Sequence, residues 1–373
     1  MIENRFVSVG CVFVAGILTG GCSAPVEDDT TQRALMHDLA TIVLYPWQSE
    51  LAVEAEKVEA AVTAFCVTPN DAQLNAAQDA WRAARLPWKR AEMVRFGPVE
   101  DLRLGAAIDF WPARTDTIEA AITSAPEPIT SEHIASLGTS SKGMPALEYL
   151  IFDPIGGNAA ILTAIGGTDA ASVKRCAYAQ AVAETFANDA RALETAWNAE
   201  AGGFVNQVAD AGTGSTTFTS GQTAVGVIVN LLNASLQGAN ENKITAPFGL
   251  NTGSPDPSVV ESRFSDHSLE DLKENLIGVE EVYYGRHGGK TGKGLTVLVN
   301  ARSAAVDTAV KQALTDAQAK VAAVPPPFRT AITGAPDSVT ATHAAIRALR
   351  IRLSTDVASV LGISILLNDS DAD

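Results

Sequence analysis

The chain has 373 residues, 46% of them hydrophobic, which is enough for two domains with buried cores. Its 43 acidic residues outnumber its 27 lysines and arginines, so the formal net charge is −16. A nucleic-acid-binding surface needs clustered basic residues, and no such cluster stands out, so we expect no nucleic-acid partner. The negative charge favours cations or cationic ligands instead.

The N-terminal residues 1–21 are typical of a lipoprotein signal peptide. A positive charge at Arg5 precedes an apolar run too short to cross a bilayer, and small residues lead to Cys22. We expect Cys22 to carry the lipid and residues 22–32 to form a polar tether; an ordinary cleaved signal or an uncleaved anchor is the alternative. Ser23 stands where the inner-membrane retention signal would be Asp, so we expect an outer-membrane anchor that faces the periplasm.

Residues 33–201 follow helical periodicity and are predicted to form a first helical-bundle lobe. Pro46 is expected to kink or divide the first helix, since proline lacks the N–H that an inner helical turn needs. The next helix carries an apolar residue every seven positions, at Leu74, Trp81 and Trp88. Such a stripe is typical of a core, but Pro87 interrupts the helix beside Trp88 and several charged residues, which also suits the wall of a pocket.

The best candidate for a functional residue is Glu148. A Ser/Lys/Gly loop that includes Lys142 leads into Pro145, and proline is favoured in the first turn of a helix. Glu148 lies about one turn inside this predicted helix, where free N–H groups and the positive end of the helix stabilise a carboxylate. It could therefore serve as a ligand or as a general base.

Three residues from irregular stretches are expected to converge on Glu148: Glu92, Asp109 and Trp111. Irregular backbone between bundle helices is where polar groups can be held apart from the core. Three carboxylates together would suit a hard cation such as Fe(III) or Ca(II) better than zinc. The alternative is a structural network in which nearby cations neutralise them, the candidates being Lys142, Arg90 and Arg114. The candidate ligand-binding residues are Glu148, Glu92, Asp109, Trp111, Trp88 and Lys142.

A Gly/Ser/Thr-rich interval at 202–221 is the predicted linker to a second helical-bundle lobe at 222–373. In this half, His267 and Glu270 lie three residues apart at a predicted helix start and form a weaker metal candidate. Helix capping with solvated charges is the alternative for this pair.

The fold class that follows is all-α, with two packed helical-bundle lobes, because strand alternation is absent and helical periodicity runs through both halves. The sequence contains no H-E-x-x-H, G-x-S-x-G or G-x-x-x-x-G-K motif, which argues against zincin, serine-hydrolase and nucleotide-hydrolase chemistry. Its five histidines are scattered, so the sequence shows no pattern typical of a catalytic zinc site with three protein ligands.

The segment Gly143–Leu150 reads G-x-x-x-x-E-Y-L and resembles the central motif of the imelysin family of bacterial envelope proteins, which includes an insulin-cleaving membrane protease and iron-regulated relatives. In the peptidase-like and metal-binding branches this motif reads G-x-H-x-x-E. Here Pro145 stands at the histidine position, which argues against proteolysis and His/Glu metal binding. Ser265–Gly285 and Leu361–Asp373 resemble further segments of the family.

The resemblance implies two related bundles packed on each other, with a shared cleft near the Glu148 helix. It also implies a disulfide, because the contexts of Cys66 and Cys176 resemble a cysteine pair seen in many members. These two cysteines form the even pair left after Cys11 and Cys22, and an exported protein favours their oxidation. A metal role for them is the weaker alternative.

Three functions are compatible with these features. We take as the main hypothesis a periplasm-facing imelysin-like lipoprotein that binds a metal or small ligand in an iron-linked uptake role; the metals considered are iron, calcium and zinc. The second is an imelysin-type metallopeptidase with Glu148 as base or ligand. The third is a non-enzymatic module that binds an envelope protein partner.

Overall fold

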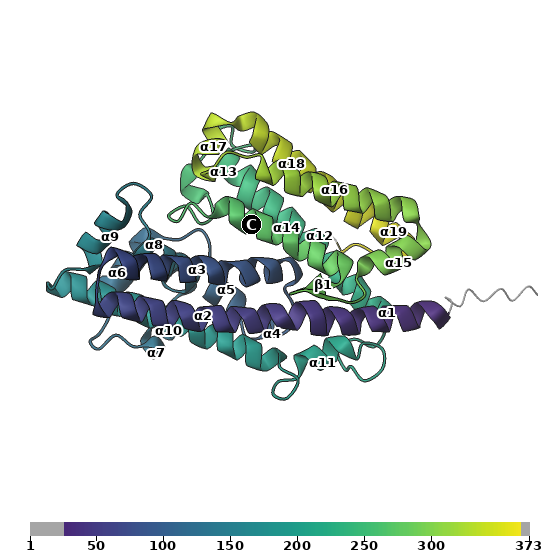
Figure 1. Ribbon diagram of the computed structural model, residues 1–373, viewed down its shortest axis with the longest axis horizontal. Helices are drawn as coiled ribbons and strands as arrows, with labels where there is room; N and C mark the ends of the chain where they lie inside the picture. The colour runs from purple at the N-terminus through teal and green to yellow at the C-terminus, as the bar shows by residue number, and fades with distance from the viewer. Residues whose placement is uncertain (1–25, 367–373) are drawn as a thin grey trace, which may run out of the picture.

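The computed structural model describes residues 26–366 and shows an all-α protein of two packed helical-bundle lobes, which confirms the predicted fold class (Figure 1). The predicted signal peptide and its Cys22 lie outside the described residues. Within the described part, the one sheet is an antiparallel hairpin of β1 (Arg286–His287) and β2 (Lys290–Thr291). In that part no helix combines the length and apolar character needed to cross a membrane.

The first lobe is built on three long helices, α2, α3 and α10, which pack side by side. Each has an apolar face of residues three or four apart, such as Leu51, Ala55 and Val58 of α2, all fully buried. Its elements are α1 (Val26–Asp38), η1 (Leu39–Leu44), α2 (Tyr45–Val67), α3 (Asp71–Ala91), η2 (Glu92–Val94), α4 (Pro98–Asp101), α5 (Leu104–Ile108), α6 (Thr115–Ser124), α7 (Ser131–Ser136), η3 (Thr139–Ser141), α8 (Gly143–Ile151), α9 (Gly157–Ile165), α10 (Ala170–Trp197) and α11 (Phe204–Ala209).

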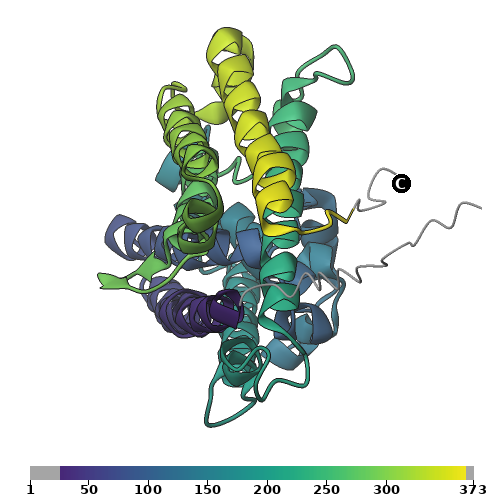
Figure 2. The same ribbon diagram turned by 90° about the vertical axis from the view of Figure 1, so that its right-hand side faces the viewer.

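The second lobe packs α14 against α16, and α16 and α12 against α18. Figure 2, which views α1 and α2 nearly end-on, shows this lobe stacked on the first. Its helices are α12 (Gly221–Asn240), η4 (Glu241–Thr245), α13 (Ala246–Phe248), η5 (Pro257–Val259), α14 (Ser268–Tyr284), α15 (Leu295–Arg302), α16 (Ala304–Ala322), α17 (Phe328–Gly334), α18 (Pro336–Ile351), η6 (Arg352–Val357) and α19 (Ala358–Leu361).

Two prolines follow π-helical turns and lie within helical backbone. Pro46 comes just after η1, a π-helical segment, and helical backbone continues from α1 through η1 into α2. Pro247 comes just after η4, which is also π-helical. A π turn shifts the backbone hydrogen-bond pattern, so the helix does not need a hydrogen bond from the N–H that proline lacks. The predicted division at Pro46 is therefore not found.

Two segments expected to be irregular are packed. Helix α1 begins at Val26, inside the stretch predicted to be a tether, and its Gln32 is buried and donates to Gln222 of α12 at 2.5 Å. The predicted linker contains α11, and its two phenylalanines both contact Phe96 edge-to-face; they are Phe204 and Phe218. Aromatic burial orders this glycine-rich segment, although its composition suggested a flexible one.

The lobes meet where α3 crosses α14, and their backbones touch there. A Cβ on Gly278 of α14 would lie 2.6 Å from the carbonyl oxygen of Arg90, so only glycine fits at this position. Further along α14, Trp47 Nε1 donates to Glu281 at 2.7 Å. His287 bridges Glu281 and Glu50 at 2.8 Å each. These hydrogen bonds raise the pKa of His287 to about 9, so it bridges the lobes as a cation at neutral pH.

The first lobe also contains a disulfide between Cys66 and Cys176, with a Cα–Cα distance of 5.7 Å. It joins the end of α2 to α10 and closes a loop of 110 residues. Restricting the unfolded chain in this way stabilises the folded lobe.

Candidate functional site

Three charged side chains lie at the C-terminal end of α3, where the helix meets the second lobe: Arg85, Lys89 and Glu92. They are spaced four and three residues apart and so share one face. Arg85 and Lys89 have only 1% and 0% of their surface exposed. A charged group is buried at high cost unless it is paired, and partners come from both lobes.

Arg85 and Lys89 each bridge carboxylates of the two lobes. Arg85 donates to both oxygens of Asp271 at 3.1 and 2.7 Å, and to Asp109 at 2.7 Å. Lys89 Nζ lies 2.6 Å from Asp109 and 2.6 Å from Glu261. The lobes are therefore joined through buried ion pairs.

Lys243, which lies in the π-helical η4, adds a third cation from the second lobe. Its Nζ lies 2.5 Å from Glu92 and 3.1 Å from Glu261, and it donates to Asn275 at 2.9 Å. We call the seven connected charged residues the interlobe charge network: Arg85, Lys89, Glu92, Asp109, Lys243, Glu261 and Asp271. Four carboxylates against three cations leave the network with a formal charge of −1.

The charges in the network hold one another in the ionised form. Burial alone would raise the pKa of Asp109 and of Glu92, but the neighbouring cations outweigh burial and lower both pKa values below their usual range. Burial and Arg85 oppose the charge on Lys89, yet its carboxylate partners raise its pKa above the usual value. These groups therefore stay charged at neutral pH.

A cavity of about 410 Å³ lies beside the network, between the lobes, and we call it the interlobe cavity. Its polar lining consists of Glu92, Arg95, Glu100, Asp109, Trp111, Ser235, Asn242, Lys243, Glu261 and Asn275, of which Arg95 and Glu100 pair with each other. The indole Nε1 of Trp111 is buried and has no hydrogen-bond acceptor among the described residues. Trp111 is therefore a cavity-lining residue with a donor unpaired within the described part of the chain, and the Nε1 atom itself is covered by protein atoms.

The carboxylates of Glu92, Asp109 and Glu261 are close enough together to hold a metal ion, with one oxygen of each within 4.8 Å of the others. However, Lys89 Nζ already lies within hydrogen-bond distance of all three carboxylates, and Lys243 pairs with Glu92 and Glu261 as well. A bare hard cation would have to displace a buried ammonium group whose pKa is raised. The residues present therefore do not fit a resident metal ion at this cluster.

Glu148 is placed apart from the three clustered carboxylates and is not among the residues that line the interlobe cavity. It is 3% exposed, and its Oε1 accepts hydrogen bonds from Phe264 N at 3.0 Å, Ser265 N at 2.8 Å and Ser265 Oγ at 2.7 Å. Burial raises its pKa to about 7, although the hydrogen bonds from Ser265 oppose this shift. Glu148 thus ties α8 to a loop of the second lobe.

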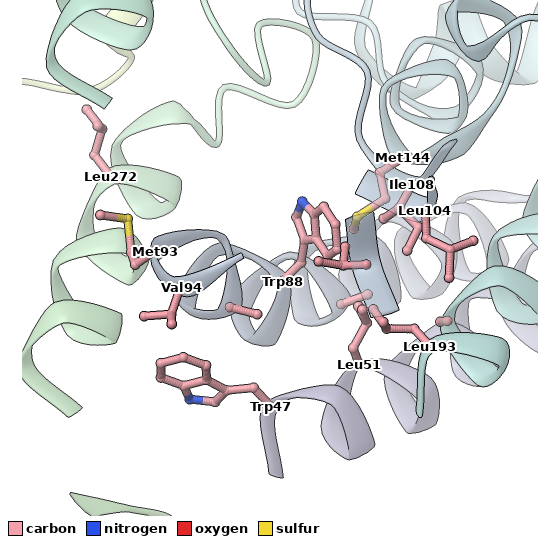
Figure 3. Packing of buried hydrophobic residues seen from close by; sticks show 14 of the residues in the cluster. Trp47, Leu51, Trp88, Met93, Val94, Leu104, Ile108, Met144, Leu193 and Leu272 are labelled. Carbon is pink, nitrogen blue, oxygen red and sulfur yellow. The ribbon is translucent and has the colours of Figure 1, made fainter. Parts of the chain in front are cut away.

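The structure places the other sequence candidates in different surroundings. Trp88 packs in the core near Leu51 and Ile108, as Figure 3 shows, while its Nε1 donates to Asp109 at 2.7 Å. Lys142 donates to the carbonyl oxygen of Ala135 at 2.7 Å and is not part of the interlobe charge network.

The weaker metal pair is also separated by its contacts. His267 packs edge-to-face on Trp81, and burial lowers its pKa, whereas Glu270 is solvent-exposed and pairs with Lys273 at 2.6 Å. Of the cations suggested as structural partners, Arg90 pairs with Glu274 and Arg114 stacks on Phe110. A structural network is present, but other cations form it.

Five members of the network were not predicted as site residues from the sequence: Arg85, Lys89, Lys243, Glu261 and Asp271. Lys243 and Glu261 lie in stretches without clear periodicity, so nothing indicated which way they point. Arg85 offered a usable signal, because it falls on the apolar face of α3 with Trp81 and Trp88, where a charge needs a buried partner.

The fold and this site define a class: an all-α protein of two packed bundles with an ionised, cavity-lining cluster between them. The imelysin family model (Peptidase M75, imelysin) matches residues 45–355, and the chain belongs to this family. The chain is also similar to iron-regulated protein A of Synechococcus elongatus, with 26% identity over 334 residues that cover 88% of this chain and 85% of the relative.

Two solved structures share the fold. A crystal structure of a protein described as an iron-regulated protein A precursor, from Parabacteroides distasonis, has a TM-score of 0.78 and 20% identity, covering 89% of this chain and 95% of that one. An imelysin-like protein from Psychrobacter arcticum has a TM-score of 0.70 and 16% identity, covering 91% and 98%.

Proposed function

We propose that this chain is an exported binding protein that holds a small polar ligand in the interlobe cavity, in an iron-linked uptake role. The observation that carries the proposal is the cavity itself: polar groups from both lobes line it, and one lining residue, Trp111, has a buried N–H without an acceptor among the described residues. Its volume of about 410 Å³ lies in the usual range for small-molecule sites.

The charges beside the cavity favour a ligand that is neutral or positively charged. The network has an excess of one negative charge, and an anionic ligand would add to it in a partly buried site. Because Lys89 already neutralises the clustered carboxylates, the fit is better for a whole small molecule than for a bare metal ion.

The names of the relatives support the link to iron, since two of them are described as iron-regulated protein A or its precursor. A neutral Fe(III) chelate contains iron and adds no negative charge to the site, so it agrees with both observations. The peptidase alternative gains less support. Glu148 is already bound by three donors, and Pro145 stands where the peptidase-like motif has histidine.

Binding can be tested by titrating the purified protein with neutral Fe(III) tris(acetohydroxamate) while following tryptophan fluorescence. Anionic Fe(III) citrate, iron-free acetohydroxamate and free Fe(III), Ca(II) and Zn(II) salts serve as comparison probes. We expect saturable binding of one neutral chelate per chain and weaker binding of the citrate complex. No saturable binding of any probe, or tight binding of a bare metal ion alone, would contradict the proposal.

A matched pair of variants locates the ligand. Trp111→Phe removes the unpaired N–H at the cavity, and the loss of one hydrogen bond of about 1 kcal/mol weakens binding roughly fivefold. Trp197→Phe is the control, because Trp197 Nε1 is also buried without an acceptor among the described residues but packs against Phe96 and Phe204 instead. Equal affinities in both variants would place the ligand elsewhere.

We also propose that Cys22 carries a lipid that anchors the protein in the outer membrane, facing the periplasm. The signal-like residues before Cys22 support this, and α1 begins four residues after it, at one end of the long axis of the molecule (Figure 1). Cys22→Ser should abolish labelling by radioactive palmitate and release the protein from membranes, whereas Cys11→Ser, within the signal itself, should change neither. Continued labelling of the Cys22→Ser protein would refute the assignment.

A further inference from the structure

The segment Glu261–His267 connects the two polar sites described above. Glu261, at its start, places its carboxylate against Lys89 and the interlobe cavity. Three residues later, Phe264 and then Ser265 donate to Glu148. One short loop of the second lobe therefore touches both the cavity and the family-motif glutamate of the first lobe.

The backbone of this segment is held in an unfavourable conformation. Ser262 has φ of 47° and Asp266 has φ of 57°, and both belong to the left-handed region that side-chain-bearing residues seldom adopt. Among the described residues, only one other non-glycine residue, Arg103, has a positive φ. Such conformations persist where surrounding contacts fix them, and they gather at functional sites.

Contacts fix the segment along its length, beginning with the ion pairs of Glu261 with Lys89 and Lys243. Ser262 Oγ donates to Asp271 at 2.5 Å, and Arg329 donates to Asp266 at 2.6 Å, so each strained residue has a partner. Between them, the Glu148 carboxylate takes up the N–H groups of Phe264 and Ser265 and the Ser265 hydroxyl. Among the described residues of the first lobe, Glu148 is thus the one that binds the middle of the segment by several hydrogen bonds.

We propose that Glu148 is a positioning residue: by accepting three hydrogen bonds from Phe264 and Ser265, it holds the segment Glu261–His267 in its bent form and so places the Glu261 carboxylate at the interlobe cavity. The effect on ligand affinity rests on the proposed function, whereas the position of Glu261 does not. The chemistry of the motif glutamate is then that of an acceptor for a loop of the other lobe.

The charged groups near Glu148 influence its pKa, and therefore how its hydrogen bonds to the segment Glu261–His267 depend on pH. They are Arg85 of α3, Asp271 of α14 and Arg263 of the segment itself. Burial keeps the pKa of Glu148 near 7, and opening of the segment would hydrate the carboxylate and return its pKa toward the ordinary value. Because the closed form then binds the proton more tightly, raising the pH from about 4.5 to 7 favours release of the segment.

The test compares Glu148→Ala, Glu148→Gln and the wild-type protein by hydrogen–deuterium exchange of the peptide that spans residues 262–268. Alanine has no acceptor, so we expect its segment to lose protection at least tenfold. Glutamine keeps the acceptor oxygen and cannot ionise, so it should retain protection at all pH values, while wild-type protection, after correction for intrinsic exchange, falls as pH rises from about 4.5 to 7 and then levels off. Glu119→Gln is the control, because Glu119 accepts from Tyr149, the neighbour of Glu148.

A crystal structure of the Glu148→Ala variant shows the position of the Glu261 carboxylate without the need for a bound ligand. We expect the Glu261 carboxylate to leave Lys89 and the cavity in this variant, and affinity for the neutral Fe(III) chelate to fall about tenfold, with recovery in Glu148→Gln. Unchanged protection of residues 262–268, or an unmoved Glu261, would overturn the positioning role. If the wild-type protein binds no chelate, the proposed function fails, but exchange and the crystal structure still decide the role of Glu148.

Discussion

At the scale of single residues, the site is governed by the pairing of buried charges. Lys89 is fully buried, and its ammonium group contacts Asp109 and Glu261 at 2.6 Å each. A buried ion pair adds little to stability compared with an apolar substitute, but removing one partner leaves the other charges uncompensated in a region of low dielectric. Single substitutions in the network should therefore be far more damaging than those at the surface.

Lys89→Met tests this reasoning. The methionine fills a similar volume but leaves four carboxylates of the network with only Arg85 and Lys243, so we expect the free energy of unfolding to fall by roughly 3–5 kcal/mol. Urea denaturation at neutral pH measures the change. The control is Lys57→Met, which removes an exposed pair with Glu54 at 2.7 Å and should cost less than about 1 kcal/mol. Similar losses in the two variants would show that burial does not determine how much an ion pair contributes to the free energy of unfolding.

Glu148 gives a pH-dependent prediction. Its pKa is raised from 4.5 to about 7, so between these values the folded chain holds a proton that the unfolded chain has lost, and stability falls as pH rises. Glu148→Gln removes this dependence. At about pH 5 the variant and the wild type should be similar, and above pH 7 the variant should be more stable by roughly 3 kcal/mol. Urea denaturation at several pH values checks this, and an unchanged difference from pH 5 to 8 would contradict the buried site.

At the scale of elements, the helices were predictable and their junctions were not. Helical periodicity located the long helices, and Pro145 lies in the first turn of α8, where it was expected. The sequence also led us to expect Glu92 and Asp109 together, and the structure brings them together. It could not indicate that Glu148 would bind the loop at Phe264, because the partners are 116 residues apart and their contact depends on how the lobes pack.

The crossing of α3 and α14 yields a prediction for this scale. Gly278→Ala adds a Cβ 2.6 Å from the Arg90 carbonyl oxygen, so the helices must separate, and we expect a loss of about 1–3 kcal/mol in the free energy of unfolding. Gly226→Ala in α12 is the matched control, since its Cβ would lie 3.8 Å from Ile363. There, alanine should be neutral or stabilise the helix by up to about 1 kcal/mol. Thermal unfolding distinguishes the two, and equal effects would rule out the close approach.

At the scale of the whole molecule, two bundles are joined by polar contacts, and one bundle contains a disulfide. The family resemblance implied both the paired bundles and the cysteine pair. The lining of the interlobe cavity could not be derived, because its residues come from stretches spread between Glu92 and Asn275. Such a site exists only once both lobes are folded and docked.

The disulfide carries a prediction about the whole chain. Replacing Cys66 and Cys176 together by alanine frees a loop of 110 residues in the unfolded state, and we expect a loss of about 4–5 kcal/mol. Guanidinium denaturation of the variant and the oxidised wild type measures it. The wild type with its disulfide reduced should match the variant; a reduced protein as stable as the oxidised one would refute the contribution.

The contact at Gly278 has a mechanical consequence. Because backbone meets backbone there, we expect relative motion of the lobes to pivot near this point rather than to slide α14 along α3. Asp271, with its partner Arg85, lies about two turns before the pivot, and Glu281, which accepts from Trp47, lies about one turn after it. Helix α14 is thus bound to the first lobe on both sides of Gly278. A tilt of α14 that opens the interlobe cavity would move its other end, near His287, closer to the first lobe.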